Sequence, residues 1–131
     1  MNTAPRHDPF PVAAPYAGIY AHGVETPRGA RFVHVSGQVG VSPQGELRAD
    51  FDGQCRQAIA NVRAVLEQAG MTLANVVKMS FFLVRREDMA GLVAVRQELL
   101  DGVRPAVTTV LVAGLLHPDW LVEIEALAYA D

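Results

Sequence analysis

The sequence predicts one α+β domain of β-β-α-β-α-β-β order, in which two helices cover a single face of a β-sheet. Three observations lead to this fold class. Segments with strand-like alternation and segments with helical periodicity follow one another in that order along the 131 residues. Half of the residues are hydrophobic, which is enough for one core. No linker, repeat or low-complexity tract divides the chain, and two helices are too few to cover both faces of the sheet.

The N-terminal part of the chain predicts an extended arm followed by two strands. Residues 1–15 are rich in proline and alanine and lack the basic start and apolar block of a signal peptide. We therefore expect an arm there and a single domain over residues 16–131. Strands are predicted over residues 16–21 and, from alternating β-branched residues, over residues 31–36 with an extension to residue 41. Ser42-Pro-Gln-Gly45 then has proline and glycine placed for a tight turn.

Helical periodicity is clearest over residues 51–69. The apolar residues of this segment recur at 3- and 4-residue steps, which places them on one face of a helix. They are Phe51, Cys55, Ala58, Ile59, Val62, Val65, Leu66 and Ala69. Asp50 or Asp52 can cap the start of the helix, and Gly70 can end it. Because Cys55 belongs to the apolar face, we expect a buried and unreactive thiol.

The second half of the chain predicts a strand, a helix and two further strands. The first strand covers residues 76–84, and the helix begins after Asp88, which can cap it, and stops near Gly102. The last two strands are predicted over residues 106–113 and 120–128. In the strand over residues 76–84, the side expected to face the helices carries Val77, Met79, Phe81 and Leu83.

The same alternation predicts the composition of the sheet face that no helix covers. Large apolar and ionisable side chains are mixed on it: Phe32, Phe82, Leu121, Leu127, His34, Lys78, Glu123 and Glu125. Large apolar groups exposed to water favour association. We therefore expect this face to be buried against identical subunits, where its polar groups can line pockets. The alternative is a monomer with a partly solvated sheet face.

Composition and charge exclude several classes of function. Cys55 is the only cysteine and the four histidines lack metal-ligand spacing, so we expect neither a disulfide nor a metal or cofactor site. The formal net charge is −3 and basic residues are not clustered, so we expect no nucleic-acid partner. No apolar run approaches the roughly 20 residues of a membrane-spanning helix. We expect no membrane association and a cytoplasmic location.

Five short motifs occur in order between residues 15 and 128. They are Pro15-Tyr16, Ser36-Gly-Gln-Val39, Gln57-Ala-Ile-Ala-Asn61, Pro105-Ala106 leading into Thr109-Val110, and Val122-Glu-Ile-Glu-Ala126. Together they resemble the RidA/YjgF family of imine and enamine deaminases. The resemblance implies a chorismate-mutase-like fold with a mixed sheet, and a homotrimer whose sheets surround a central barrel. It also implies a small-molecule pocket in each cleft between subunits.

The resemblance assigns roles to several residues of this chain. The family pocket holds a 2-imino acid, and a glutamate near the C-terminus positions the water that attacks the imine carbon, so that ammonia leaves. Glu123 occupies the matching position and is the expected catalytic residue. Tyr16, Ser36 and Gly37 match positions that shape the substrate site.

Three substrate-site positions depart from the family pattern. Val107 stands where the family has an arginine that binds the substrate carboxylate, Val93 where many members have an asparagine, and Thr109 where a cysteine is usual. A carboxylate in a partly buried pocket needs a cation or several donors. Losing one partner of such a pair costs about 2–5 kcal/mol. We therefore expect the usual 2-imino acids to be poor substrates.

Other charged residues have less specific interpretations. Arg104 is the nearest candidate to replace the missing arginine, whereas Arg31 and Arg96 are expected to be solvated surface charges. Glu123 is either a base that handles water or a carboxylate of the barrel wall that pairs with Lys78. His34 is expected to be a hydrogen-bonded residue of the same sheet face.

The sequence leaves two main functions open. The first is hydrolytic deamination of a reactive enamine or imine other than the usual 2-imino acids, in which Val93 and Val107 form an apolar wall. The second is a non-catalytic trimer that binds or senses a small molecule, which the missing arginine favours. A ribonuclease, a label that the family has carried, is disfavoured by the acidic charge balance.

Overall fold

The computed structural model describes residues 6–7 and 21–131 of the chain. Its main elements are β1 (Arg6–His7), β2 (Gly23–Val24), β3 (Arg31–Val39), α1 (Phe51–Gln68), β4 (Val76–Leu83), α2 (Met89–Leu99), β5 (Ala106–Leu111) and β6 (Val122–Ala130). Short 3-10 helices, Leu73–Asn75 and Arg86–Asp88, precede β4 and α2. From β3 onward the predicted order of elements is confirmed.

The N-terminal elements differ from the sequence-based expectation. The predicted strand over residues 16–21 lies outside the described residues except for Ala21, which forms a parallel bridge with Ala106 at the start of β5. Its backbone N–H donates to the carbonyl oxygen of Pro105 at 2.9 Å. The two-residue strands β1 and β2 pair antiparallel with each other and were not predicted.

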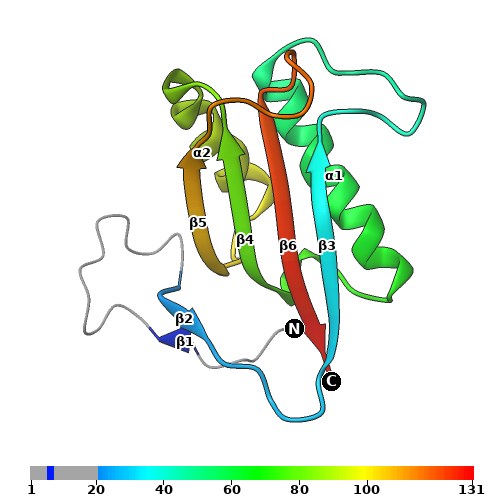
Figure 1. Cartoon of the computed structure of the whole chain (residues 1–131). Helices are drawn as coiled ribbons and strands as arrows, with labels where there is room; N and C mark the ends of the chain where they lie inside the picture. Colours follow the sequence, from blue (N-terminus) through cyan, green and yellow to red (C-terminus); the bar gives the residue numbers. More distant parts are fainter. Residues whose placement is uncertain (1–5, 8–20) are drawn as a thin grey trace.

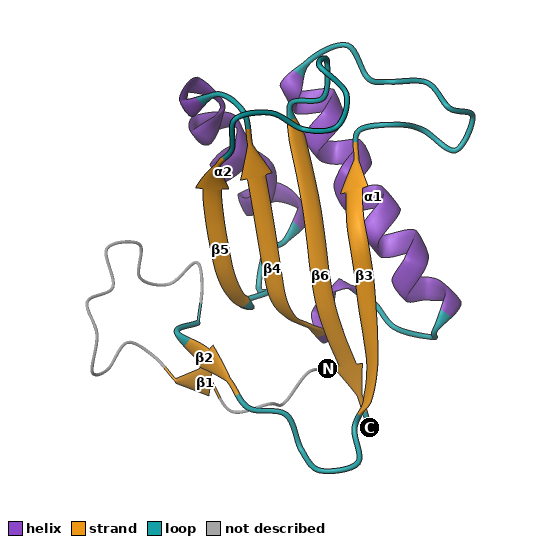
Figure 2. Cartoon of the chain, in the orientation of Figure 1, coloured by secondary structure: helices purple, strands orange, loops and turns teal. Residues whose placement is uncertain are grey.

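The remaining strands form one mixed sheet of order β3-β6-β4-β5. Strands β4 and β5 are parallel, and the other two pairings are antiparallel. Both helices lie behind this sheet in Figure 1, and Figure 2 shows the same two-layer arrangement by secondary structure. The predicted α+β architecture with two helices on one sheet face is therefore confirmed.

Local chemistry explains where the helices and turns begin and end. Asp50 is the N-cap of α1, and its carboxylate accepts a hydrogen bond from the backbone N–H of Gly53 at 2.8 Å. Gly70 follows the helix with a φ of +71°, a conformation that glycine adopts without steric cost. The prediction that Asp88 caps α2 is wrong. Its carboxylate accepts two hydrogen bonds from the Arg85 guanidinium instead, and the helix has no side-chain cap.

The core fills the space between the helices and the sheet. Phe51, Ile59, Val62 and Leu66 of α1 meet Met79, Phe81, Leu83, Val122 and Ile124 of the sheet there. Val77 is an exception, because it packs with Tyr129, Val24 and Ala30 in a second cluster. The pairing with β6 shifts between Val76 and Lys78, and such a bulge adds a residue that reverses the alternation. The prediction that Val77 faces the helices is therefore wrong.

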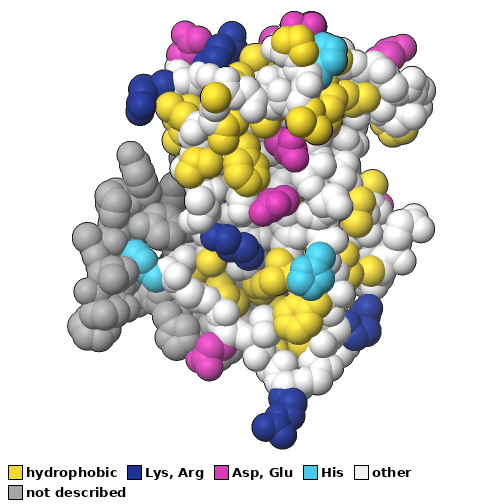
Figure 3. Space-filling view, viewed as in Figure 1, with side chains coloured by type: hydrophobic (Ala, Val, Ile, Leu, Met, Phe, Trp, Pro, Cys, Tyr) yellow, Lys and Arg dark blue, Asp and Glu magenta, His cyan; other side chains and the backbone are white. Residues whose placement is uncertain are grey.

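Most of the opposite face of the sheet is uncovered in the described chain, and only at one end do Val24 and Ala30 pack over Val77 and Tyr129. Figure 3 views this face and shows hydrophobic, acidic, basic and histidine side chains mixed across it. Phe32 and Val110 each expose 40% or more of their surface, as expected for apolar groups with no covering layer. Within residues 6–7 and 21–131, no helix is both long and apolar enough to cross a membrane.

Candidate functional site

Glu123 lies on the uncovered face of β6, in the middle of the sheet. It stands between Val39 of β3 and Phe82 of β4 in the strand register. The β3–β6 pairing shifts between Val35 and Gln38, so two residues of β3, Ser36 and Gly37, stand opposite one residue of β6. This bulge is next to the Glu123 carboxylate.

Gly37 and Glu123 are in direct contact. A Cβ atom built on Gly37 would lie 1.9 Å from Oε2 of Glu123 and 2.8 Å from its Cδ, so the carboxylate occupies the space of the missing side chain. The backbone of Gly37 does not have a positive φ. Glycine is therefore needed here for close approach and not for backbone conformation. The structure thus brings together two of the residues that the sequence assigned to the site.

The basic residue of this face does not pair with Glu123. Lys78 stands opposite Leu127 in the register, four residues along β6 from Glu123. Its ammonium group donates a hydrogen bond to the hydroxyl of Thr108 at 2.8 Å. The predicted Lys78–Glu123 pairing is therefore wrong. Lys78 instead borders a shallow hollow of about 180 Å³ with His34 and Glu125.

The other predicted substrate residues lie on the helix side of the sheet. Val107 pairs with Met79 and Thr109 with Phe81, and both of these β4 residues belong to the core beneath the helices. Together with Val93 of α2, they line a groove of about 900 Å³ between α2 and β5. Successive side chains of a strand point to opposite faces. Within one chain, Glu123 is therefore separated by the sheet from Val93, Val107 and Thr109.

The roles assigned to these residues remain predictions. Tyr16 lies outside the described residues. Ser36 and Gly37 belong to the Glu123 side of the sheet, so the predicted site residues form two groups, one on each face. An apolar wall of Val93 and Val107 next to Glu123 is not formed by a single chain.

Two polar side chains of α1, one buried and one half-buried, hold the strand ends that flank Glu123. Gln54 is 1% exposed, its amide group donates to the carbonyl oxygens of Arg48 and Asp119, and its Oε1 accepts from the N–H of Leu121 at 2.8 Å. The Asn61 amide donates to the carbonyl oxygens of Val39 and Val41 at 3.1 and 3.0 Å. Asn61 belongs to a motif identified from the sequence, whereas Gln54 was missed because a glutamine on a helix is usually exposed.

Arg96 is a functional candidate that the sequence interpretation missed. Its guanidinium carbon lies 5.0 Å from the ring centroid of Phe81, and the residue is half-buried. Burial lowers the pKa of Arg96 from its ordinary value. The group stays charged at neutral pH because a guanidinium is not deprotonated in proteins. The prediction of a solvated surface charge is wrong for Arg96, although it is confirmed for the exposed Arg31.

A helical pattern could have identified Arg96. The residue stands four positions after Leu92 and four before Leu100, and both of these leucines are buried. Positions four apart lie on the same helix face. Arg96 therefore lies on the core-facing side of α2. It was assigned to the surface because it is charged.

The thiol of Cys55 belongs to the hydrophobic core. Cys55 is fully buried, and burial raises the pKa of its thiol to about 12. A thiol of this kind is a poor nucleophile at neutral pH. Among residues 6–7 and 21–131, no group of three His, Cys, Asp or Glu side chains could hold a metal ion.

Comparison with known proteins identifies the family. The family model described as endoribonuclease L-PSP matches residues 12–130. The 2-iminobutanoate/2-iminopropanoate deaminase of Escherichia coli is 36% identical over 115 residues, which cover 85% of this chain and 87% of that protein. A RutC family protein of Pyrococcus horikoshii is 35% identical over 116 residues, covering 87% and 89% of the two chains.

Solved structures agree with the sequence matches. A Rid family protein of Yersinia pestis superimposes with a TM-score of 0.76 at 35% identity, over 84% of this chain and 86% of that chain. The structure of Escherichia coli TdcF with bound serine has a TM-score of 0.73 at 34% identity, over 87% and 90% of the two chains. The chain therefore belongs to the RidA/YjgF family, whose fold it shares and whose named relatives include imine deaminases.

Proposed function

We propose that this protein is a homotrimeric deaminase that hydrolyses a reactive imine or enamine in a pocket between subunits. The observation that carries the proposal is the contact between Glu123 and Gly37, where a carboxylate lies over a β-bulge on an otherwise uncovered sheet face. The deaminase names of relatives about 35% identical over most of the chain support the reaction class.

Glu123 has the chemistry that this hydrolysis requires. Its carboxylate accepts a proton from a water molecule while the water oxygen attacks the imine carbon. The protonated carboxyl group returns this proton to the nitrogen, and the carboxylate then transfers the hydroxyl proton of the tetrahedral adduct to the nitrogen as the C–N bond breaks, so that ammonia leaves and a carbonyl group is left. One imine and one water thus give one carbonyl compound and one ammonia, with no oxidant or reductant. An enamine reaches the same step after it tautomerises to the imine.

The division of the site residues between two sheet faces supports a shared pocket. A small molecule cannot contact Glu123 and Val107 of the same chain, because the sheet lies between them. A neighbouring subunit that brings its α2–β5 edge against the uncovered face would join both groups in one cleft. The exposed Phe32 and Val110 give such packing an apolar contribution.

The substrate is proposed to differ from the usual small 2-imino acids. Val107 offers no charge and no hydrogen bond at the position where the family binds a carboxylate. A substrate that places its polar group elsewhere, or that carries a larger apolar part, fits the α2–β5 groove better than 2-iminopropanoate does.

The decisive experiment measures ammonia release from a panel of imines and enamines with small, aromatic and uncharged substituents, each against its spontaneous hydrolysis. Glu123→Gln keeps the size of the side chain and removes the base, so we expect turnover to fall by roughly 10²- to 10⁴-fold. Glu125→Gln is the matched control, because Glu125 lies on the same face but is exposed. Unchanged turnover in Glu123→Gln would contradict the assigned role, and a monomer in analytical ultracentrifugation at micromolar concentration would contradict the shared pocket.

A non-catalytic binding trimer is the second candidate, and the valine at position 107 favours it. Thermal-shift screening combined with product analysis separates the two functions. Ligands that stabilise the protein without any product would favour binding.

A further inference from the structure

The groove between α2 and β5 extends beyond the hollow that contains Val107. A second hollow of about 360 Å³ lies at the C-terminal end of α2, and it shares Val93 and Arg96 with the first. The two hollows therefore form one continuous depression, the α2–β5 groove. The first hollow alone, of about 900 Å³, is as large as sites that hold a drug-sized molecule.

The charged lining of the α2–β5 groove is mainly basic. Arg86, Arg96 and Arg104 contribute to it, whereas Asp101 is the only acidic residue among the described lining residues. Most other lining side chains are apolar, including Met89, Val93, Val107 and Leu111. A groove of this composition is complementary to a ligand that combines an anionic group with an apolar body.

Arg96 is the cation that the sheet holds in place. Its guanidinium lies over the ring of Phe81, which stands next to Thr109 in the β4–β5 register. Val107 is two residues before Thr109 on the same side of β5. Arg96 therefore reaches, from the helix, the same patch of the sheet from which an arginine at position 107 would project.

We propose that Arg96 binds the anionic group of the substrate, so that the α2–β5 groove selects acids with a bulky apolar side chain. The proposal rests on the proposed function, because it assigns the substrate class of that same pocket. The planar guanidinium makes two parallel hydrogen bonds to a carboxylate, and stacking on Phe81 fixes its plane before the ligand arrives. The anionic group lies toward α2, and the side chain lies along Val93 and Val107.

Three stable ligands test this proposal without turnover. We would measure binding of 3-phenylpropanoate, its uncharged amide 3-phenylpropanamide, and propanoate by isothermal titration calorimetry. The wild-type protein should bind 3-phenylpropanoate more tightly than either of the others, because only this ligand has both the charge and the bulk. If the wild type binds the amide as tightly as the acid, the proposal is overturned.

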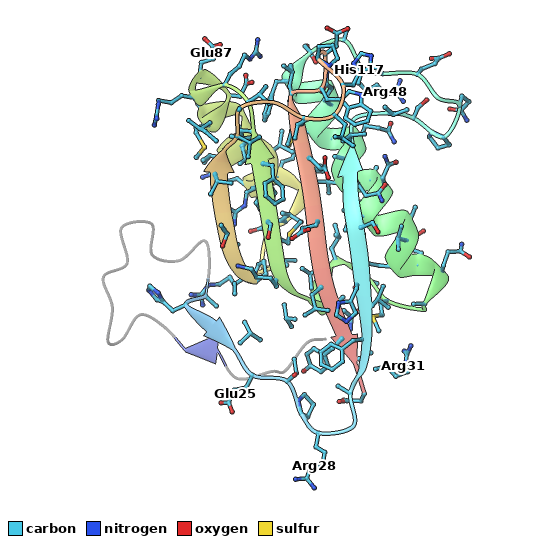
Figure 4. All side chains as sticks on the ribbon, in the orientation of Figure 1. Glu25, Arg28, Arg31, Arg48, Glu87 and His117 are labelled. Atoms are coloured by element: carbon cyan, nitrogen blue, oxygen red, sulfur yellow. The ribbon has the colours of Figure 1, made fainter. Side chains whose placement is uncertain are left out.

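Arg96→Gln isolates the guanidinium. We expect it to weaken binding of 3-phenylpropanoate by roughly tenfold or more and to leave binding of the amide nearly unchanged. Arg28→Gln is the matched control, since Arg28 is exposed and projects away from the sheet at the far end of the molecule (Figure 4). A folded Arg96→Gln protein that still binds the acid like the wild type would overturn the assignment.

A second variant covers the case in which Arg96→Gln does not fold. Thr109→Asp places a carboxylate beside the guanidinium, where it competes with the ligand, and should also abolish the preference for the acid over the amide. Retention of that preference would overturn the proposal. Turnover by the wild type is measured separately, with the panel of imines and enamines. Acid-selective binding without turnover would reject the deaminase and leave Arg96 as the anion site. Turnover without acid-selective binding would support the deaminase and reject Arg96 as the anion site.

Discussion

The contact between Gly37 and Glu123 makes a single methyl group a probe of the catalytic proposal. In Gly37→Ala, the new Cβ would lie 1.9 Å from Oε2, 2.8 Å from Cδ and 3.0 Å from Cγ of Glu123. All three distances are shorter than a van der Waals contact, so the carboxylate must leave its position. The backbone itself accepts alanine, because Gly37 is not among the described glycines with a positive φ.

The structural and catalytic effects of this change should differ greatly. Glu123 is only half-buried and can adopt another rotamer, so we expect a stability loss of about 1 kcal/mol. Displacing a catalytic group by about 1 Å can cost roughly 10²-fold in rate. The measurements are the melting temperature and ammonia release from the best substrate of the panel.

Two controls make the result interpretable. Gly114→Ala adds the same methyl group in open space, with no atom within 4 Å, and should change neither quantity. In the double variant with Glu123→Gln, the alanine should reduce turnover little further, because the group that it displaces is already inactive. A folded Gly37→Ala protein with wild-type turnover would refute the reasoning, since the carboxylate would then act equally well from another position.

Two further predictions concern Val107 and Cys55. Val107→Arg should improve binding of propanoate by roughly tenfold or more, measured by calorimetry, because it restores a cation on the strand; no gain would mean that the valine does not limit binding of small acids. Burial raises the pKa of the Cys55 thiol to about 12 from the 9.0 of a free thiol, so the folded state binds this proton more tightly than the unfolded state does. The resulting stabilisation of the folded state is complete below pH 9 and is lost as the pH rises toward 12. The unfolding free energy from urea titrations should therefore fall over this range, and Cys55→Ala should remove that part of the decline; an equal decline in both proteins would contradict the assignment.

Much of the fold could be predicted because its periodicities are strong. The N-cap at Asp50 and most of the apolar face of α1 follow from local sequence and are confirmed, although Val65, which was assigned to that face, is exposed. The uncovered sheet face also followed from alternation. The failures have physical causes that local patterns do not record. Val77 is on the unexpected face because a bulge inserts one residue, and a bulge depends on pairing with β6.

The candidate site was predictable only in part. Motif resemblance identified Gly37 and Glu123, but their contact depends on the strand register and on a second bulge. Asp88 was assigned as a cap because its position in the sequence suited one, yet Arg85 binds its carboxylate. Arg96 was assigned to the surface because arginine is usually exposed, whereas an aromatic ring can hold a guanidinium in a half-buried position. In each case the position of the side chain depends on a contact with another residue, and periodicity does not identify that contact.

The absence of an arginine at position 107 and the half-buried position of Arg96 are two aspects of one arrangement. Val107 and Thr109 face the helix side of β5, and Arg96 reaches the same patch of sheet from α2. A second guanidinium projecting from position 107 would enter this space, where two like charges close together repel each other. The small apolar side chain of valine leaves room for Arg96 to stack on Phe81. It follows that a cation on the strand and a cation on the helix are alternatives, and that the gain from Val107→Arg should be larger when Arg96 is replaced by glutamine.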